Sequence, residues 1–381
     1  MKTKVWNAFV TLPVTFILAL GIGSCGGGAS GPGGGPGSPS AGEYLWEFSL
    51  TDQNLYFATV NSSTGQLGVP TASGGEACNS NGTIPTIAVT PSNKYAFVID
   101  NCFSQINTYV INGPNISLGT AQAPFSALGD LESVAIDPKG MYLYAIATNP
   151  QALYQIGVNG GSGELTLLST VMESADIQVV VADPNGKFIY ANDPTDGLIL
   201  AYLVNGGSLS PVSGSPFTVP SSGQPIYLNM ESNGKFLYAP LLSGGIAGFA
   251  IDSSTGALSD IPGSPFDTGN LPFTLASDPL GRFLYAIDNN LSSVEGFNID
   301  ATTGALTSVM GSPFNFASPV NSLAVDPSGN FLYATVNATT LADSMILGFT
   351  IDGSSGSISA LATSPFPAPP FPTNVVSLNV R

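Results

Sequence analysis

Three aspartates of this chain occupy the same position in a segment that the sequence repeats, each directly after a short run of β-forming residues. They are Asp100, Asp193 and Asp288, and polar residues fill the next position of the repeat, namely Asn101, Asn289, Thr148 and Asn337. If the fold gathers these positions, the carboxylates could bind a divalent cation or act as an acid–base pair, and their neighbours could bind a ligand. The alternative is that polar residues simply end a strand and begin a loop.

The composition of the chain excludes several kinds of catalytic site and binding partner. The chain has no histidine, which excludes His-based triads, His metal sites and His general bases. Its net charge of −17 with only eight Lys and Arg residues argues against nucleic acid and against polybasic attachment to anionic lipid. No cofactor is required by any motif, although a divalent cation is compatible with the three aspartates.

The repeated segment itself reads Asp-Pro-x-Gly followed by Phe-Leu-Tyr-Ala, as at residues 278–286 and 326–334. Its second position recurs every 46 to 48 residues, at Pro91, Pro138, Pro184, Ser232, Pro279 and Pro327. A period this regular indicates one supersecondary unit copied many times. Each unit contains four short apolar runs separated by turn residues, which predicts four antiparallel strands per unit.

Four strands per repeat of this length are typical of a β-propeller blade. Fourth-strand signals occur seven times, at Leu67, Ile116, Leu165, Leu209, Leu258, Leu306 and Ile358. The sequence therefore predicts an all-β, seven-bladed β-propeller of four-stranded antiparallel blades. Residues 43–46 resemble a second strand without a first, and residues 374–380 a first strand without a second. We expect the C-terminal strand to join the N-terminal blade and close the ring, which removes open sheet edges.

Other polar residues of the repeat have a structural explanation. An Asp before Pro caps nearby backbone donors of a turn, which is the role expected of Asp137, Asp183, Asp278 and Asp326. Basic residues lie around the same turns and would form a sparse ring on the face opposite the three aspartates. We expect these to be solubilising turn residues: Lys94, Lys139, Lys187, Lys235 and Arg282.

The N-terminus has the features of a targeting segment. Lys2 and Lys4 precede a mostly apolar run, and small residues then lead to Cys25, as in a bacterial lipoprotein signal. Residues 1–24 are the expected signal peptide, Cys25 the lipidation site, residues 25–42 a Gly/Ser/Pro-rich tether, and residues 43–381 the propeller. The alternative is an uncleaved membrane helix. Gly26 rather than Asp follows the cysteine, which by resemblance to the sorting rules of Gram-negative bacteria favours the outer membrane. We therefore expect a lipid-anchored protein of the cell envelope.

Two further cysteines, Cys78 and Cys102, lie in loops of neighbouring repeats that would emerge on one face. In an exported protein this arrangement suggests a disulfide. The alternative is that they are two independent small residues.

The segments at residues 326–337 and 296–307 carry a family resemblance. They resemble the seven-bladed lactonase-type propellers, which include 6-phosphogluconolactonases, and also propellers with Tyr-Val-Thr-Asn repeats. The resemblance covers residues 43–381 and implies the fold. The enzymes of that family are associated with His, Arg and Glu around a pocket. Because this chain has no histidine, the resemblance assigns no catalytic residue to it.

Three functions fit these observations. The first is a binding or interaction scaffold of the envelope that contacts an unknown ligand, glycan or protein, is a monomer, and meets the membrane only through its lipid. The second is a sugar-lactone hydrolase that uses Asp100, Asp193 and Asp288 at the propeller mouth. The third is a purely structural envelope protein.

Overall fold

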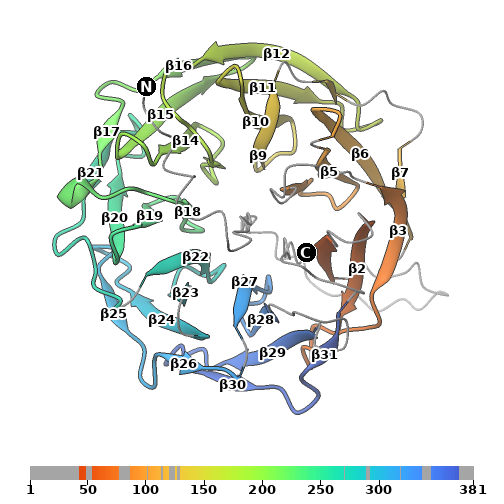
Figure 1. Cartoon of the computed structure of the whole chain (residues 1–381), viewed down its shortest axis with the longest axis vertical. Helices are drawn as coiled ribbons and strands as arrows, with labels where there is room; N and C mark the ends of the chain where they lie inside the picture. The colour runs from red at the N-terminus through yellow and green to blue at the C-terminus, as the bar shows by residue number, and fades with distance from the viewer. Residues whose placement is uncertain are drawn as a thin grey trace, which may run out of the picture.

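The structure is a computed structural model, and it describes residues 43–48, 54–76, 86–100, 102–112, 115–119, 125–126, 129–269, 271–288, 292–317, 319–336 and 345–368. These residues form seven antiparallel sheets that stand around a central axis as the blades of a propeller (Figure 1). The predicted all-β, seven-bladed fold is confirmed. Within the described ranges, no helix has the length and hydropathy needed to cross a membrane.

The blades follow one another along the chain. Blade 1 contains β1 (Glu43–Phe48), β2 (Asn54–Val60) and β3 (Thr71–Glu76). Blade 2 contains β4 (Ile87–Val89), β5 (Tyr95–Asp100), β6 (Gln105–Asn112), β7 (Asn115–Leu118) and β8 (Phe125–Ser126). Blade 3 contains β9 (Asp130–Ile136), β10 (Tyr142–Thr148), β11 (Ala152–Val158) and β12 (Leu165–Met172). Blade 4 contains β13 (Val180–Ala182), β14 (Phe188–Asp193), β15 (Leu198–Asn205), β16 (Ser208–Pro211) and β17 (Phe217–Thr218), and a short 3-10 turn follows at Pro220–Ser222.

The remaining blades repeat the same order. Blade 5 contains β18 (Asn229–Met230), β19 (Phe236–Pro240), β20 (Ile246–Ile251) and β21 (Leu258–Asp260). Blade 6 contains β22 (Pro272–Ser277), β23 (Phe283–Asp288), β24 (Ser293–Ile299), β25 (Leu306–Ser308) and β26 (Phe314–Asn315). Blade 7 contains β27 (Val320–Val325), β28 (Phe331–Val336), β29 (Met345–Ile351), β30 (Ile358–Ala360) and β31 (Phe366–Pro367).

The turn between the first and second strands is built as the sequence predicts. The carboxylate of Asp326 accepts backbone N–H groups from Ser328 at 3.1 Å, Asn330 at 2.8 Å and Phe331 at 2.7 Å. Gly329 follows with a φ of 70°, a conformation in which glycine avoids a steric penalty. The buried aspartate therefore accepts hydrogen bonds from the backbone N–H groups of the turn. The predicted structural role of this residue is confirmed.

The outer edge of several blades differs from the prediction of four continuous strands. In blades 4 and 6 a Gly-Ser-Pro-Phe segment interrupts the fourth strand, and in blade 7 a Ser-Pro-Phe segment does so. In each case a two-residue strand then pairs again with the third strand. In blade 6, the hydroxyl of Ser312 accepts the Gly296 N–H at 3.0 Å, and the bond from Ser312 to Pro313 is cis. Because proline has no N–H to donate to the sheet, the outer strand is split at this residue.

Adjacent blades are joined by the second strand of one and the turn between the third and fourth strands of the next. Tyr238 of β19 donates its hydroxyl to the Gly304 carbonyl of blade 6 at 2.7 Å, and the ring of Phe236 packs under the same glycine. A Cβ on Gly304 would lie 2.5 Å from that ring, so only glycine allows the contact. Equivalent hydroxyl bonds are Tyr190 to Gly256 (3.0 Å), Tyr285 to Gly356 (2.8 Å) and Tyr333 to Gly65 (2.8 Å).

The last of these bonds joins the two ends of the ring. Tyr333 of blade 7 and Gly65 of blade 1 are 268 residues apart in sequence, and Leu45 and Ala58 of blade 1 share an apolar cluster with Phe331. Blade 7 therefore contacts blade 1 directly (Figure 1). The predicted closing strand at residues 374–380 lies outside the described residues and stays a prediction.

The contribution of the tyrosine hydroxyl bond between blades can be tested with a matched pair of variants. Tyr238→Phe removes a buried hydrogen bond and leaves the Gly304 carbonyl without it, so we expect a loss of about 1 kcal/mol of stability. Tyr144 holds the same repeat position in blade 3, but its buried hydroxyl has no hydrogen-bond partner. We therefore expect Tyr144→Phe to be neutral or slightly stabilising, as measured by thermal and urea unfolding. Equal losses in the two variants would show that the hydroxyl bond is not what stabilises the interface.

Candidate functional site

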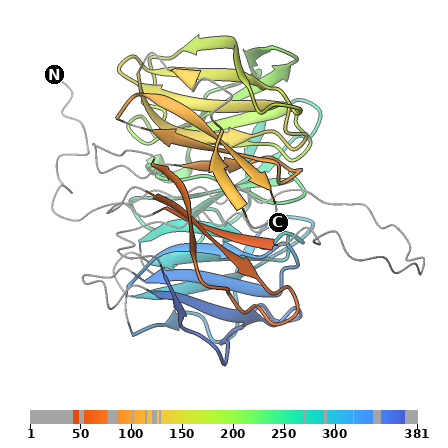
Figure 2. The same cartoon turned by 90° about the vertical axis from the view of Figure 1, so that its right-hand side faces the viewer.

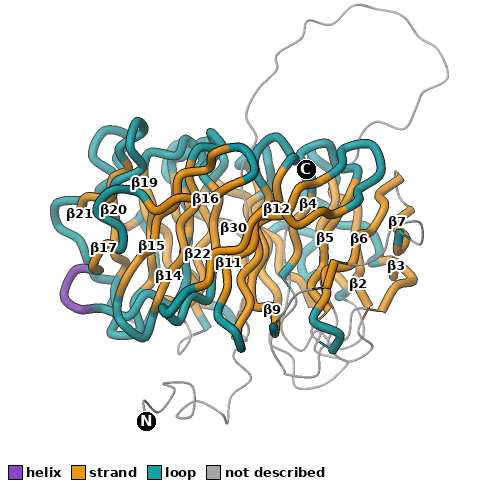
Figure 3. Tube along the Cα trace, turned by 90° about the horizontal axis from the view of Figure 1, so that it is seen from above, coloured by secondary structure: helices purple, strands orange, loops and turns teal. Residues whose placement is uncertain are grey.

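The ring has two edges with different connections, as its side views show (Figures 2 and 3). We call loop face the edge that carries the connections from second to third strands and from each blade to the next. We call turn face the opposite edge, which carries the other two turns of every blade. Asp100, Asp193, Asp288 and Thr148 end β5, β14, β23 and β10, so all four lie at the loop face.

Strand alternation shows that the three aspartates do not form one group. Asp100 shares a side of its sheet with Ala96 and Val98, which pack in a cluster with Trp46 of blade 1. By the same alternation Asp193 faces blade 3 and Asp288 faces blade 5. Each carboxylate therefore lies in a separate interface between blades. Among the described residues, no group of three or more Asp, Glu, Cys or His side chains is placed to hold a metal ion.

Asp100 is held by amides of its own blade. Its Oδ2 accepts hydrogen bonds from Gln105 Nε2 at 3.3 Å and from Asn107 Nδ2 at 3.2 Å. Gln105 lies directly opposite Asp100 in the register of β5 and β6, and Asn107 lies two residues further on the same side. The result is a buried polar network within blade 2. Neither amide was predicted from the sequence, although both alternate with apolar residues along one strand.

Asp193 is fully buried and caps the hairpin that follows it. Its Oδ1 accepts the backbone N–H groups of Thr195 and Asp196, both at 3.0 Å, whereas its Oδ2 has no hydrogen-bond partner. Burial raises the pKa of the Asp193 carboxyl above its ordinary value, and the nearby charges of Asp196 and Asp176 raise it further. A carboxyl with a raised pKa and one uncommitted oxygen has the properties of a general base or acid.

Asp288 lies beside a second carboxylate that the sequence analysis did not select. In the register of β23 and β24, Asp288 is opposite Ser293 and Ala286 is opposite Glu295. Asp288, Ser293 and Glu295 are all buried on one side of blade 6. The signal for Glu295 was a charged residue in an otherwise apolar strand.

Thr148 contacts its own blade. Its hydroxyl donates to the Asp130 carbonyl at 3.4 Å and to Glu132 Oε1 at 3.3 Å. The next residue, Asn149, has a φ of 55°. Predicted binding residues Asn101, Asn289 and Asn337, the lipidation site Cys25 and the disulfide residue Cys78 lie outside the described residues. The pairing of Cys78 with Cys102 therefore stays a prediction.

Backbone strain distinguishes the loop face from the turn face. Of the non-glycine residues with positive φ, Ser104, Asn149 and Ser292 lie in connections from second to third strands, and Ser221 lies in a connection between blades. The turn face uses glycine at most of its positive-φ positions. Because unusual backbone conformations cluster at binding and active sites, we take the loop face as the candidate functional face.

One loop of this face exposes an aromatic ring. Phe103 precedes the strained Ser104 in the hairpin between β5 and β6, and 70% of its surface is exposed. Asp100 and Gln105 form the closing pair of the same hairpin. Phe103 was not predicted from the sequence, where its only signal is an aromatic residue in a polar loop.

Comparison with known proteins supports the resemblance seen in the repeats. The family described as "Lactonase, 7-bladed beta-propeller" matches residues 140–245 and 228–321, which run from blade 3 to the start of β27 in blade 7. The resemblance to lactonase-type propellers is thereby confirmed. A search of curated protein sequences finds no match.

Solved structures share the architecture. A periplasmic gluconolactonase from Pseudomonas aeruginosa superposes with a TM-score of 0.69 at 17% identity, covering 88% of this chain and 98% of that one. A putative 6-phosphogluconolactonase from Bacteroides fragilis has a TM-score of 0.71 at 17% identity, covering 91% of this chain and 100% of that one. A putative 6-phosphogluconolactonase from Bacteroides uniformis has a TM-score of 0.71 at 17% identity, covering 90% of this chain and 100% of that one. At these identities the likeness shows the fold alone.

Asp193 predicts a pH dependence of stability. Because its pKa is raised on folding, ionisation is costlier in the native state, and wild-type stability falls as pH rises from the ordinary value of 3.8 through the folded value. Asp193→Asn keeps an oxygen for the two N–H groups and carries no charge. We expect its unfolding temperature to match wild type near pH 3 and to exceed it near pH 7. Asp260→Asn, at an exposed residue, is the control. If the difference in unfolding temperature between Asp193→Asn and wild type were the same at every pH, the prediction of a raised pKa for Asp193 would be contradicted.

Proposed function

We propose that this lactonase-like propeller is a carbohydrate-binding protein of the cell envelope, and that its ligand contacts the loop face at Phe103. The observation that carries the proposal is an aromatic ring, 70% exposed, on a hairpin in which the next residue, Ser104, has a φ of 48°. An exposed aromatic ring provides a flat apolar platform for the apolar face of a sugar ring.

The surroundings of Phe103 suit a neutral polar ligand. Gln105 is partly exposed beside the buried carboxylate of Asp100, to which its amide nitrogen donates at 3.3 Å. The amide group is therefore oriented by the blade before any ligand arrives, and its oxygen is not used in that bond. A preformed contact of this kind reduces the ordering cost of binding.

The envelope part of the proposal is carried by the sequence. Cys25 after a signal-like segment, followed by the tether at residues 26–42, is the pattern of a lipid-anchored protein, and the Cys78–Cys102 disulfide would suit an oxidising compartment. Labelling cells with a radioactive fatty acid would test the anchor, because Cys25→Ala should abolish incorporation.

A glycan-binding assay tests the function. The full-length protein is screened on a glycan array, and the strongest ligand is titrated by calorimetry. We expect Phe103→Ala to weaken binding by roughly tenfold or more, the typical cost of truncating an aromatic anchor. Met310, which is 82% exposed on the outer edge of blade 6, provides the control, and Met310→Ala should bind like wild type. The absence of any array signal, or equal binding by the two variants, would exclude Phe103 as the ligand contact.

Sugar-lactone hydrolysis is the second candidate, and the raised pKa and uncommitted oxygen of Asp193 favour it. The ionised carboxylate would take a proton from water, the hydroxide would add to the lactone carbonyl, and the ring oxygen would leave with a proton, giving the open hydroxy acid. The full burial of Asp193 argues for the binding function first. A pH-stat assay with D-glucono-1,5-lactone separates the two, because hydrolysis above the buffer rate that is lost in Asp193→Asn would establish the lactonase.

A further inference from the structure

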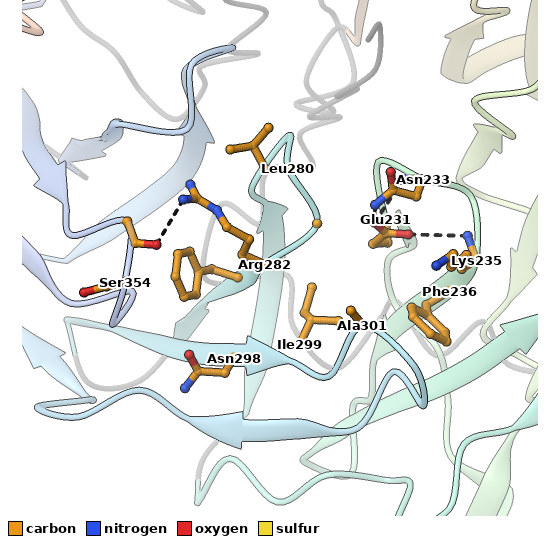
Figure 4. A pocket seen from close by; sticks show the side chains of 13 residues that line it. Glu231, Asn233, Lys235, Phe236, Leu280, Arg282, Asn298, Ile299, Ala301 and Ser354 are labelled. Atoms are coloured by element: carbon orange, nitrogen blue, oxygen red, sulfur yellow. Dashed lines mark hydrogen bonds between the residues drawn. The ribbon is translucent and has the colours of Figure 1, made fainter. Parts of the chain in front are cut away.

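A pocket opens on the turn face, on the opposite edge from Phe103. It has a volume of about 320 Å³ and lies between turns of blades 5, 6 and 7. Asn233 and Lys235 line it from blade 5, Leu280, Arg282 and Asn298 from blade 6, and Ser354 from blade 7 (Figure 4). This volume is large enough for a small ligand.

The basic residues of the turn face can be compared position by position, because the repeat places one before the second strand in four blades. Lys94 donates to the Gly160 and Gly161 carbonyls of the next blade at 3.3 and 3.1 Å. Lys187 donates to the Ser253 carbonyl at 3.3 Å, and Arg282 Nη1 donates to the Gly353 carbonyl at 3.0 Å. These three side chains link neighbouring blades, which is a more specific role than the solubilising one expected from sequence.

Lys235 occupies the same position and departs from this pattern. Among the described residues its ammonium group has neither a carbonyl acceptor nor a salt-bridge partner, and the side chain is exposed and lines the pocket. Lys235 is thus the member of the repeated set whose charge is not used to join blades. A difference of this kind between equivalent positions of similar repeats is expected where a side chain binds a ligand.

The other charged side chains of the pocket have partners within the protein. Arg282 forms a salt bridge with the buried Asp278, with 2.6 Å between Nε and Oδ2. Glu231 accepts the Asn233 and Lys235 backbone N–H groups at 3.0 and 3.3 Å. One ammonium group therefore remains, which matches a single carboxylate better than a phosphate, since phosphate sites usually bring several cations together.

The amide and hydroxyl groups of the pocket offer mainly acceptors. Asn233 Nδ2 donates to Glu231 at 2.6 Å, Asn298 Nδ2 to the Thr307 carbonyl at 3.4 Å, and Ser354 Oγ to Asp352 at 2.6 Å. Their oxygens remain for ligand hydroxyl groups. Leu280, which is 57% exposed, adds an apolar wall. One cation, several acceptors and an apolar wall are complementary to a hydroxylated carboxylic acid of monosaccharide size.

We propose that the turn-face pocket binds a sugar acid, with its carboxylate on Lys235 and its hydroxyl groups on Asn233, Asn298 and Ser354. This site is separate from the proposed carbohydrate contact at Phe103, and neither depends on the other.

Calorimetric titration of the full-length protein tests the proposal with a pair of probes that differ in the carboxylate, D-glucuronate and D-glucose. We expect D-glucuronate to bind roughly tenfold more tightly than D-glucose, and Lys235→Gln to reduce it to the D-glucose level, the loss expected for one charge-assisted contact. Lys187→Gln removes the same charge from the equivalent position in blade 4 and should change the affinity less than about twofold.

Several outcomes would overturn the site. They are no binding of D-glucuronate by wild type, equal binding by Lys235→Gln, an equal loss in Lys187→Gln, and equal competition by inorganic phosphate, which would indicate general attraction of anions. Phe103→Ala should leave D-glucuronate binding unchanged, so the failure of one site is distinguishable from the failure of the other.

Discussion

The contact on which this structure depends is the one between the Phe and Tyr side chains of a second strand and the glycine turn of the following blade. It combines an apolar ring under a residue without Cβ with a buried hydroxyl bond, as Phe236 and Tyr238 show against Gly304. Burial raises the pKa of the Tyr238 hydroxyl, so the group stays a neutral donor under physiological conditions. The same chemistry repeated around the ring fixes the spacing of the blades, and so the positions of all their loops.

The amino-acid sequence is consequently more constrained on the turn face than on the loop face. Turns of the turn face take part in the contact between blades, and their carboxylates are used locally. Asp252, for example, accepts a hydrogen bond from the Ser254 hydroxyl and backbone N–H groups from its turn, which lowers its pKa to about 2. The described loops of the loop face take no part in this contact. A binding function could therefore change on the loop face with little effect on stability.

The sequence predicted the fold well because its signals are local and repeated. The Asp-Pro-x-Gly turn, the two-residue alternation and the regular spacing each involve residues close together in the chain, and Asp326 shows the predicted capping directly. The sequence did not show which neighbouring blade Asp100 and Asp193 each face, because that depends on how the blades pack against one another. The sequence also could not distinguish Lys235 from Lys94 and Lys187, which are the same residue type at the same repeat position. Only the hydrogen bonds in the structure show the difference.

The hydrogen bond from Tyr333 to Gly65 has a consequence for cooperativity. An open array of repeats can lose a terminal unit while the rest stays folded, since each unit contacts only its neighbours. Here a bond between residues 268 apart gives blade 1 a neighbour on both sides, so the molecule has no terminal unit to lose. Unfolding one blade would break two interfaces rather than one, so we expect the ring to unfold as a single unit, with a long loop to close each time it refolds.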